Sequence, residues 1–145
     1  MVNWPQISID TQKEFEKCYG CGQDNPIGLK MRINQQDNTA RAEFTASKLH
    51  QGWSGVVHGG IVAALLDEAM SYAALFQEMK TVTARIDVRI KRPIHTGEPL
   101  SITARIIRRT RKIVETRGTI SLADGTTVAE ATATQYILNT KAGKQ

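Results

Sequence analysis

Apolar and polar residues alternate with a period of two over most of this chain, a pattern that predicts β-strands. Two such segments come early, at residues 29–34 and 40–45, and Asp37-Asn38 predicts the turn that joins them. Four more follow in the second half of the chain, at residues 82–90, 100–106, 113–122 and 127–138. Strands that are joined by turns this short pair in the antiparallel direction.

One segment, residues 58–79, departs from the alternation because it is apolar on nearly every face of a helix. A helix that is apolar all round is buried on all sides. A single helix cannot cover both faces of a flat sheet of this length. We therefore expect an α+β fold in which a curved antiparallel sheet wraps around one long central helix.

Composition agrees with one globular domain over residues 1–145. Hydrophobic residues make up 41% of the chain and charged residues 23%, and no internal repeat or linker is visible. These proportions exclude a disordered tail protein. The N-terminal part, residues 1–28, holds a short polar helix at residues 11–17 and the glycine-rich loop that follows it.

Cysteine content and hydropathy indicate a cytoplasmic protein. Two cysteines, Cys18 and Cys21, are too few for a disulfide framework, which favours a reducing compartment. The first ten residues lack the basic and then apolar pattern of a signal peptide. The apolar helix is too short to span a bilayer and carries Asp67 and Glu68 at its middle, so we expect no membrane partner.

The middle of that helix carries the first candidate for chemistry. Asp67 follows six apolar residues, and an isolated carboxylate in such a place is costly unless it is paired or has a catalytic task. Burial would also raise its pKa, which suits a general base or a nucleophile. The alternative is that Asp67 or Glu68 caps a neighbouring loop or faces solvent in a groove between subunits.

The start of the helix carries the second candidate. His58, Gly59 and Gly60 precede the apolar run, and glycines leave the first backbone N–H groups open to close approach. These N–H groups lack partners within the helix and lie at the positive end of its dipole, so they suit an anion or a polarised carbonyl oxygen. The alternative is a glycine-rich helix entry selected for backbone shape alone.

The spacing of the two candidates predicts a homodimer. Gly59 and Asp67 are eight residues apart, about 12 Å along one helix, so a single carbonyl carbon cannot contact both. Two antiparallel helices across a two-fold axis would place Gly59 of one chain near Asp67 of the other, which gives two equivalent sites. Ser71 lies one turn after Asp67, where it would bond the acid or the substrate, or serve only as a small helix residue.

Several segments within roughly residues 18–138 match one known family together. They are the run from His58-Gly59-Gly60 to Asp67-Glu68-Ala69, the strand and turn at residues 83–98, residues 128–133 and the cysteine loop at residues 18–29. In these segments the chain resembles the hotdog-fold acyl-CoA thioesterases of the phenylacetate-pathway (PaaI-like) type. The spacing from His-Gly-Gly to the aspartate is the most specific part of the resemblance.

The resemblance implies an enzyme that hydrolyses an acyl-CoA thioester to free acid and coenzyme A at a dimer interface. The Gly59 amide would polarise the thioester carbonyl, His58 would shape the loop around it, and Gly60 would contact the substrate. Asp67 from the partner chain would act as the base for water or as the nucleophile. Thr83 matches a position where some relatives place a hydroxyl that orients water. The resemblance implies no metal and no cofactor beyond the coenzyme A of the substrate.

The loop before the helix is where this chain departs from the family pattern. Relatives often carry an Asn or Gln side-chain amide six residues before the histidine, where this chain has Gly52. Either Gln51, beside it, takes over that contact to the substrate, or the substrate is positioned differently in this chain. Trp53 would line an acyl pocket, which favours an aromatic or medium-chain acid.

Basic residues offer a contact to the phosphates of coenzyme A, which arginine forks suit. The candidates for this contact are Arg89, Arg92, Arg108 and Arg109. A net charge of +5 also fits a polyanionic partner. The alternative is a solvated hairpin. We expect no nucleic-acid partner, because no aromatic residue lies between Arg105 and Lys112.

The Cys18-x-x-Cys21 pair has three interpretations. A redox pair would need a βαβ context, which is absent. A zinc site needs four ligands, and only His50, His58 and His95 remain to help. We therefore expect a structural loop with two reduced thiols.

Two other functions on the same fold stay open. A protein that binds or senses acyl-CoA without turnover is one, although a pure binder gains nothing from a buried acid at Asp67. A hydratase is the other, but it would need a histidine base paired with an acid on the helix, and His58 precedes the helix proper. Pairing of dimers into a homotetramer and the identity of the acyl group also stay open.

Overall fold

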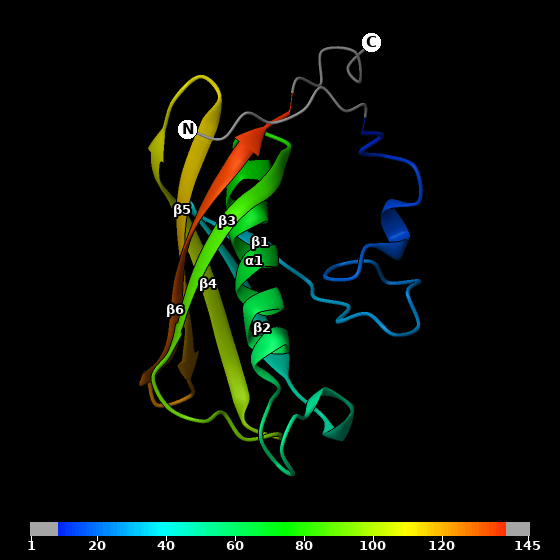
Figure 1. Ribbon diagram of the computed structural model, residues 1–145, viewed down its shortest axis with the longest axis vertical. Coiled ribbons are helices and arrows are strands. Elements are labelled where there is room, and N and C mark those ends of the chain that lie inside the picture. The colour runs from blue at the N-terminus through cyan, green and yellow to red at the C-terminus, as the bar shows by residue number, and fades with distance from the viewer. Residues whose placement is uncertain (1–8, 139–145) are drawn as a thin grey trace.

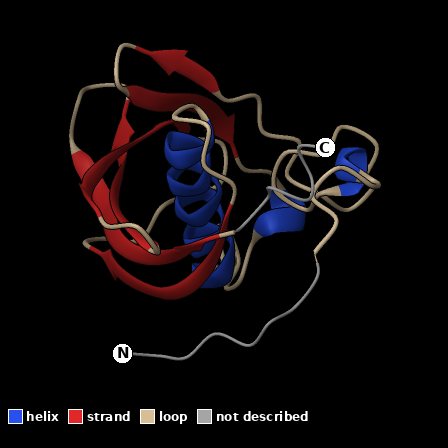
Figure 2. Ribbon diagram, turned by 90° about the horizontal axis from the view of Figure 1, so that it is seen from above, coloured by secondary structure: helices blue, strands red, loops and turns tan. Residues whose placement is uncertain are grey.

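Six antiparallel strands curve around one long helix in the part of the chain that the structure, a computed structural model, describes, residues 9–138 (Figure 1). Seen from above, the sheet wraps around the helix on one side, and the N-terminal segment lies on the other (Figure 2). The helix α1 spans Gly59–Leu75, and the strands are β1 Asn34–Gln36, β2 Thr39–Thr45, β3 Thr81–Ile90, β4 Pro99–Arg109, β5 Ile113–Leu122 and β6 Thr127–Ile137. The α+β prediction is confirmed.

The order of the strands leaves β3 at one edge of the sheet. The order is β1-β2-β4-β5-β6-β3, so the hairpin-connected strands β4, β5 and β6 are neighbours, and β3 pairs with β6 alone. Strand β3 follows α1 in the chain, and its outer edge has no strand neighbour among residues 9–138. An edge of this kind is a template for pairing with another chain.

The strand predicted at residues 29–34 is wrong in its bounds, since only its last residue joins β1. Leu29 and Met31 are buried, as their alternation with polar residues predicted. Their amide N–H groups, however, donate to the carbonyl oxygens of Tyr19 at 2.8 Å and Gly20 at 2.9 Å. The pattern signalled burial correctly, but the partner of this segment is the N-terminal loop and not the sheet.

The predicted helix end at residue 79 is also wrong. Glu78 adopts a φ of 64°, in the left-handed region, and the Met79 N–H donates back to the Ala74 carbonyl at 3.0 Å. This turn closes α1 at Leu75 and places Met79 in a small buried cluster with Ala74 and Val114. The sequence offers no glycine at this turn, and glutamate in the left-handed region is uncommon. The apolar pattern therefore overestimated the length of the helix.

The prediction that the central helix is buried on all sides is correct only for the face of α1 that packs against the sheet. Gly118 on β5 lets the sheet come close, because a Cβ there would lie 3.2 Å from both Leu66 and Met70. The opposite face, with Asp67 and Glu68, is only half-buried in one chain. The residues of α1 that are buried are Val62, Leu65, Leu66, Ala69, Met70, Ala73 and Ala74.

The N-terminal segment contains less helix than expected. The helix predicted at residues 11–17 reduces to one short 3-10 turn, Phe15–Lys17. A second 3-10 turn, Lys48–His50, lies in the loop before α1. No helix among residues 9–138 is both long enough and apolar enough to cross a membrane. The single-domain assignment over residues 1–145 stays a prediction, since both ends of it lie outside the described residues.

Candidate functional site

The start of α1 presents one backbone donor without a partner. His58 is the N-cap, and its Nδ1 accepts a hydrogen bond from the Gly60 N–H at 2.8 Å. The Gly59 N–H, the first amide of the helix, donates to no acceptor within residues 9–138. It lies at the positive end of the helix dipole, where an unpaired N–H can stabilise negative charge on a carbonyl oxygen.

The loop before the helix is fixed by its own hydrogen bonds. Gln51 Oε1 accepts from the Gly55 N–H at 2.9 Å, and Gln51 forms an isolated β-bridge with Val57. The Val57 N–H donates to the Ile94 carbonyl at 2.8 Å, which ties the loop to the segment after β3. Gln51 thus holds the shape of the loop, and Trp53 at its tip is 87% exposed.

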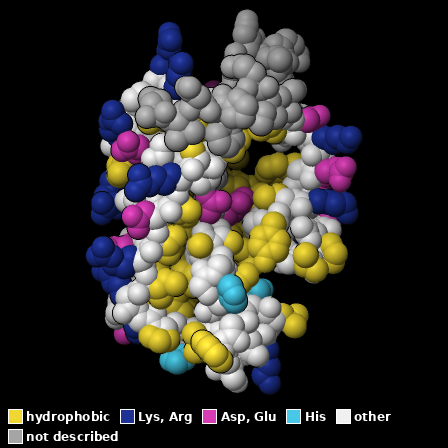
Figure 3. Space-filling model, viewed as in Figure 1, with side chains coloured by type: hydrophobic (Ala, Val, Ile, Leu, Met, Phe, Trp, Pro, Cys, Tyr) yellow, Lys and Arg dark blue, Asp and Glu magenta, His cyan; other side chains and the backbone are white. Residues whose placement is uncertain are grey.

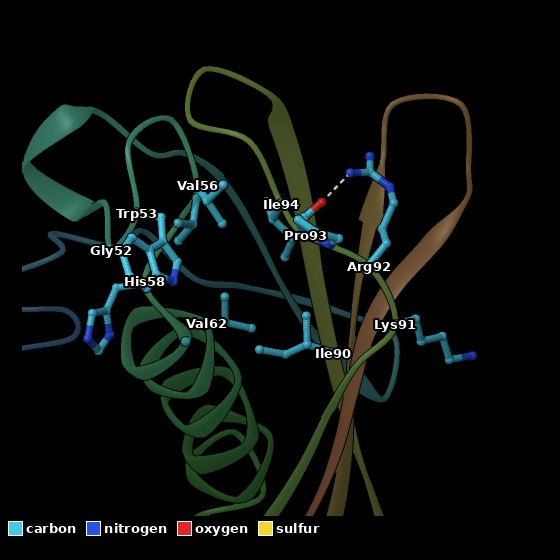
Figure 4. Close-up of a pocket in the computed structure, with 12 residues that line it drawn as sticks. Gly52, Trp53, Val56, His58, Val62, Ile90, Lys91, Arg92, Pro93 and Ile94 are labelled. Carbon is cyan, nitrogen blue, oxygen red and sulfur yellow. Dashed lines mark hydrogen bonds between the residues drawn. The ribbon is translucent and has the colours of Figure 1, made fainter.

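An open cleft of about 820 Å³ lies between this loop, the start of α1 and the end of β3. Figure 4 shows Val62 and Ile90 directed toward each other between the helix and the strand, whereas the His58 ring points away. His58 therefore supports the site through its capping bond. The residues that line the cleft are Gly52, Trp53, Val56, Val57, His58, Gly59, Val62, Ile90, Lys91, Arg92, Pro93 and Ile94.

Asp67 lies two turns further along α1, at the end of a polar network. Thr83 Oγ1 donates to Asp67 Oδ1 at 2.6 Å. Gln135, which is fully buried, donates from Nε2 to Ser71 Oγ at 2.9 Å and to Thr83 Oγ1 at 3.4 Å. Its Oε1 accepts from Thr116 Oγ1 at 3.3 Å. The network holds one carboxylate oxygen of Asp67 in place and leaves the other available to a water molecule or a substrate.

The surroundings of Asp67 make it a stronger base than an exposed aspartate. Burial raises the pKa of Asp67 above its usual value, and the hydrogen bond from Thr83 offsets part of that increase. None of the ion pairs within residues 9–138 includes Asp67. A carboxylate with a raised pKa and one free oxygen is suited to remove a proton from water.

Of the five predicted catalytic residues, the structure brings Asp67, Thr83 and Ser71 together and keeps Gly59 and His58 apart from them, at the start of the helix. Thr83 and Ser71 join Asp67 in one network within a single chain. Gly59 lies in the same helix eight residues before Asp67, which is about 12 Å along the axis. Each chain therefore carries a donor and an acid that cannot act on the same ester group.

The predicted arginine contacts are divided between the two ends of the molecule. Arg92 borders the cleft, but its Nη2 binds Glu98 Oε2 at 3.0 Å. Arg89 is exposed on β3 close to the cleft. Arg108 and Arg109 end β4 beside the C-terminal end of α1, at the opposite end of the helix from the cleft (Figure 1).

Sequence reasoning missed two members of the Asp67 network, Gln135 and Thr116. Both are fully buried polar residues, on β6 and β5 respectively. A signal for Gln135 was available, since it continues the inward-facing series of Ala131 and Ala133 along β6. A polar amide at an inward position needs partners, which points to a buried network.

One group of side chains among residues 9–138 has the composition and spacing to hold a metal ion. It consists of Cys18, Cys21 and Glu68, whose ligand atoms all lie within 4.8 Å of one another. The histidines that the sequence offered as further ligands do not belong to this group. The sequence did not indicate Glu68 as a metal ligand, because the contact joins a loop to a helix that is distant in the chain.

Comparison with known proteins identifies the family of this chain. The thioesterase superfamily model matches residues 54–129, just over half of the chain. The chain belongs to the thioesterase superfamily. The matched span begins in the loop before α1 and includes Gly59, Asp67 and Thr83. A candidate esterase of Saccharolobus solfataricus is 29% identical over 111 residues, which cover 75% of this chain and 79% of that protein.

Solved structures agree with this assignment. A thioesterase superfamily protein has a TM-score of 0.76 at 27% identity and covers 81% of this chain, which spans only 61% of that protein. A phenylacetic acid degradation-related protein of Ralstonia eutropha has a TM-score of 0.67 at 27% identity, over 75% of this chain and 86% of its own. Escherichia coli PaaI has a TM-score of 0.71 at 21% identity, over 77% of this chain and 81% of its own. The predicted hotdog fold and family are confirmed.

Proposed function

We propose that this protein hydrolyses acyl-CoA thioesters at two equivalent sites, each shared between two copies of the chain. The observation that carries the proposal is a single helix with an unpaired Gly59 N–H at its start and a networked, half-buried Asp67 two turns later. Two antiparallel α1 helices would place the donor of one copy opposite the acid of the other. Membership of the thioesterase superfamily supports the class of reaction.

The exposed apolar surface supports a second copy on the α1 face. Leu49 is 93% and Trp53 is 87% exposed, both in the loop before the helix. Figure 3 shows hydrophobic side chains gathered on this face around acidic ones at its middle. Soluble monomers rarely leave such a patch open. A homodimer would cover this surface, and a homotetramer built from two dimers is a further expectation.

Hydrolysis in this arrangement needs only groups that the chain supplies. The thioester carbonyl oxygen accepts a hydrogen bond from the Gly59 N–H, which polarises the carbon. Asp67 of the partner subunit removes a proton from water as the water oxygen attacks that carbon. The Gly59 N–H stabilises the resulting oxyanion, the carbon–sulfur bond breaks, and the thiolate of coenzyme A receives the proton. Thr83 and Ser71 hold the acid and its network in position.

The substrate class follows from the cleft and from the charges around it. The apolar walls at Val62, Ile90 and Trp53 suit an aromatic or medium-chain acyl group. Two streptococcal relatives, each 17% identical, have been solved with coenzyme A and with acetyl-CoA. With antiparallel helices, Arg108 and Arg109 of one copy would lie toward the cleft of the other, where Arg89 and Arg92 also lie, and could bind the coenzyme A phosphates.

Release of free thiol from a panel of acyl-CoAs tests the proposal. The wild type is expected to release coenzyme A, and Asp67→Asn to do so about 100-fold or more slowly because the general base is lost. Glu43→Gln, which removes an exposed carboxylate on β2, is the matched control and should keep full activity. Equal release by wild type and Asp67→Asn would contradict the assigned role, and tight binding without release would indicate a sensor.

A further inference from the structure

Two segments that are distant in sequence bring thiols and a carboxylate together outside the proposed site. Cys18 and Cys21 belong to the N-terminal loop, and Glu68 belongs to the middle of α1. Cys18 Sγ is 3.7 Å from Glu68 Oε2, and the three ligand atoms lie within 4.8 Å of one another. Ligand atoms around a tetrahedral zinc ion, with bonds of about 2.3 Å to sulfur, are about 3.8 Å apart. The group is therefore close to the size of a zinc site before any adjustment.

The backbone of the loop is shaped to this contact by two glycines. A Cβ on Gly20 would lie 2.4 Å from Glu68 Oε1, so only glycine lets the loop approach the carboxylate so closely. A Cβ on Gly22 would lie 2.2 Å from the Glu16 carbonyl oxygen, and the Gly22 N–H closes the turn by donating to the Cys18 carbonyl at 2.9 Å. This tight turn presents both thiols on the side that faces α1.

No basic side chain among residues 9–138 forms an ion pair at this place. None of the ion pairs within residues 9–138 includes Glu68, and thiols are weak hydrogen-bond donors. Cys21 is buried and Cys18 and Glu68 are half-buried, so the three groups are enclosed together. A divalent cation would bind all three groups at once and offset two of the three negative charges that two thiolates and a carboxylate carry.

We propose that Cys18, Cys21 and Glu68 bind a zinc ion that fastens the N-terminal loop to α1. Two thiolates select a borderline-soft metal over magnesium or calcium, and a Cys-x-x-Cys pair has the spacing of zinc ligands. Binding releases the protons of both thiols. The fourth position is left to a water molecule, with the Tyr72 hydroxyl within hydrogen-bond reach of the Cys21 sulfur.

This inference goes beyond the expectation of a structural loop with two reduced thiols, and it does not depend on the proposed hydrolysis. The sequence offered histidines as further ligands, whereas the fold supplies Glu68 instead. The ion would add to the contacts that already join this segment to the rest of the domain, which include the backbone hydrogen bonds from Leu29 and Met31 and a side-chain bond from Lys80 to Thr11. Its function is structural, so its loss and the loss of catalysis are separate observations.

Metal content of the full chain provides the first test. Protein that has been purified without chelators and desalted is expected to carry about one zinc ion per chain, as measured by inductively coupled plasma mass spectrometry. Cys18→Ser combined with Cys21→Ser should carry almost none. Glu68→Gln, which keeps the size of the side chain beside Gly20, should lower the affinity for zinc about 10- to 100-fold in competition with a coloured chelator. His95→Ala removes an exposed imidazole outside the cluster and should leave zinc content unchanged.

Cobalt substitution provides a second test that does not depend on the stability of the variants. Metal-free wild-type protein titrated with Co²⁺ is expected to gain a sulfur-to-cobalt charge-transfer band and the visible bands of a tetrahedral site. Helix content by circular dichroism shows whether Glu68→Gln is folded when its cobalt spectrum is weak. The proposal is overturned by wild-type protein that takes up neither zinc nor cobalt, by equal zinc affinity of Glu68→Gln and wild type in the chelator competition, or by an intact mass that shows a Cys18–Cys21 disulfide in place of metal.

Discussion

Each α1 helix carries both groups of the proposed chemistry, the Gly59 N–H at its start, here called the exposed end, and Asp67 at its middle, here called the buried end. The two groups are held in place in different ways. At the start of α1 the donor is a backbone N–H on an exposed loop, held by local bonds such as that from Gly60 to His58. At the middle the acid is a side chain whose position depends on Thr83, from the strand that follows the helix, and on Gln135, from the last strand of the sheet. A backbone donor needs only helix geometry, whereas a basic carboxylate needs burial and a network to hold it.

Replacing Gly59 with proline breaks the exposed end and leaves the buried end intact. Proline fits the first position of a helix but has no N–H, and the His58 ψ of 135° suits a residue that precedes proline. We expect kcat to fall about 100- to 1,000-fold, as for the loss of one oxyanion donor. Steady-state thioester hydrolysis measures this effect.

Gly59→Ala is the control for that substitution. It keeps the N–H, and its Cβ would meet only Ile90 Cδ1, at 3.8 Å. Its activity should stay near that of the wild type. A similar loss in both variants would mean that space at the helix start matters and the N–H does not.

Mixing two inactive variants tests whether the two ends act across the dimer. Gly59→Pro and Asp67→Asn each remove one half of both sites, but a mixed dimer contains one site with both halves intact. Refolding the two proteins together should therefore restore about one quarter of the wild-type activity, since half of the dimers are mixed and each has one working site. Activity that stays at the level of the separate variants would place both halves within one chain.

The contrast between the two ends also explains what the sequence could predict. Gly59 and Asp67 were visible because consecutive glycines at a helix start and an acid in an apolar run break a local pattern. The partners of Gln135 and Glu68 were not visible, because strand pairing and a loop that folds back on the helix bring them together. The error at residues 29–34 has the same origin, since alternation reports burial and does not name the hydrogen-bond partner.

Gln135→Leu weakens the buried end without touching the reacting groups. The leucine has a similar volume but leaves the hydroxyls of Ser71, Thr83 and Thr116 without their amide partner. We expect the free energy of unfolding to fall by about 1–3 kcal/mol and kcat to fall about 10-fold with little change in KM, because Asp67 is less firmly positioned.

Thr103→Val controls for the loss of a hydrogen bond as such. Thr103 and Thr119 share a hydroxyl contact of 2.9 Å elsewhere on the sheet. This variant should lose stability by denaturant unfolding and keep its kcat. If Gln135→Leu also kept its kcat, Gln135 would be structural only.

Glu98→Gln gives the smallest expected effect, at the exposed end. Glu98 Oε1 accepts the His95 N–H at 2.8 Å and Oε2 accepts from Arg92 at 3.0 Å; these two contacts, the backbone bond first, lower the pKa of Glu98. Because the pKa of Glu98 is lower in the folded state, the ionised carboxylate stabilises the folded state at pH values above its ordinary pKa of 4.5. This stabilisation is lost as the pH falls through the lower pKa of the folded state. Because the pair is partly exposed, we expect the wild type to exceed Glu98→Gln by less than about 1 kcal/mol near pH 7, a few degrees in Tm. The difference should disappear in acid, and a Tm difference that does not change with pH would show that the charge of Glu98 contributes nothing to the exposed end.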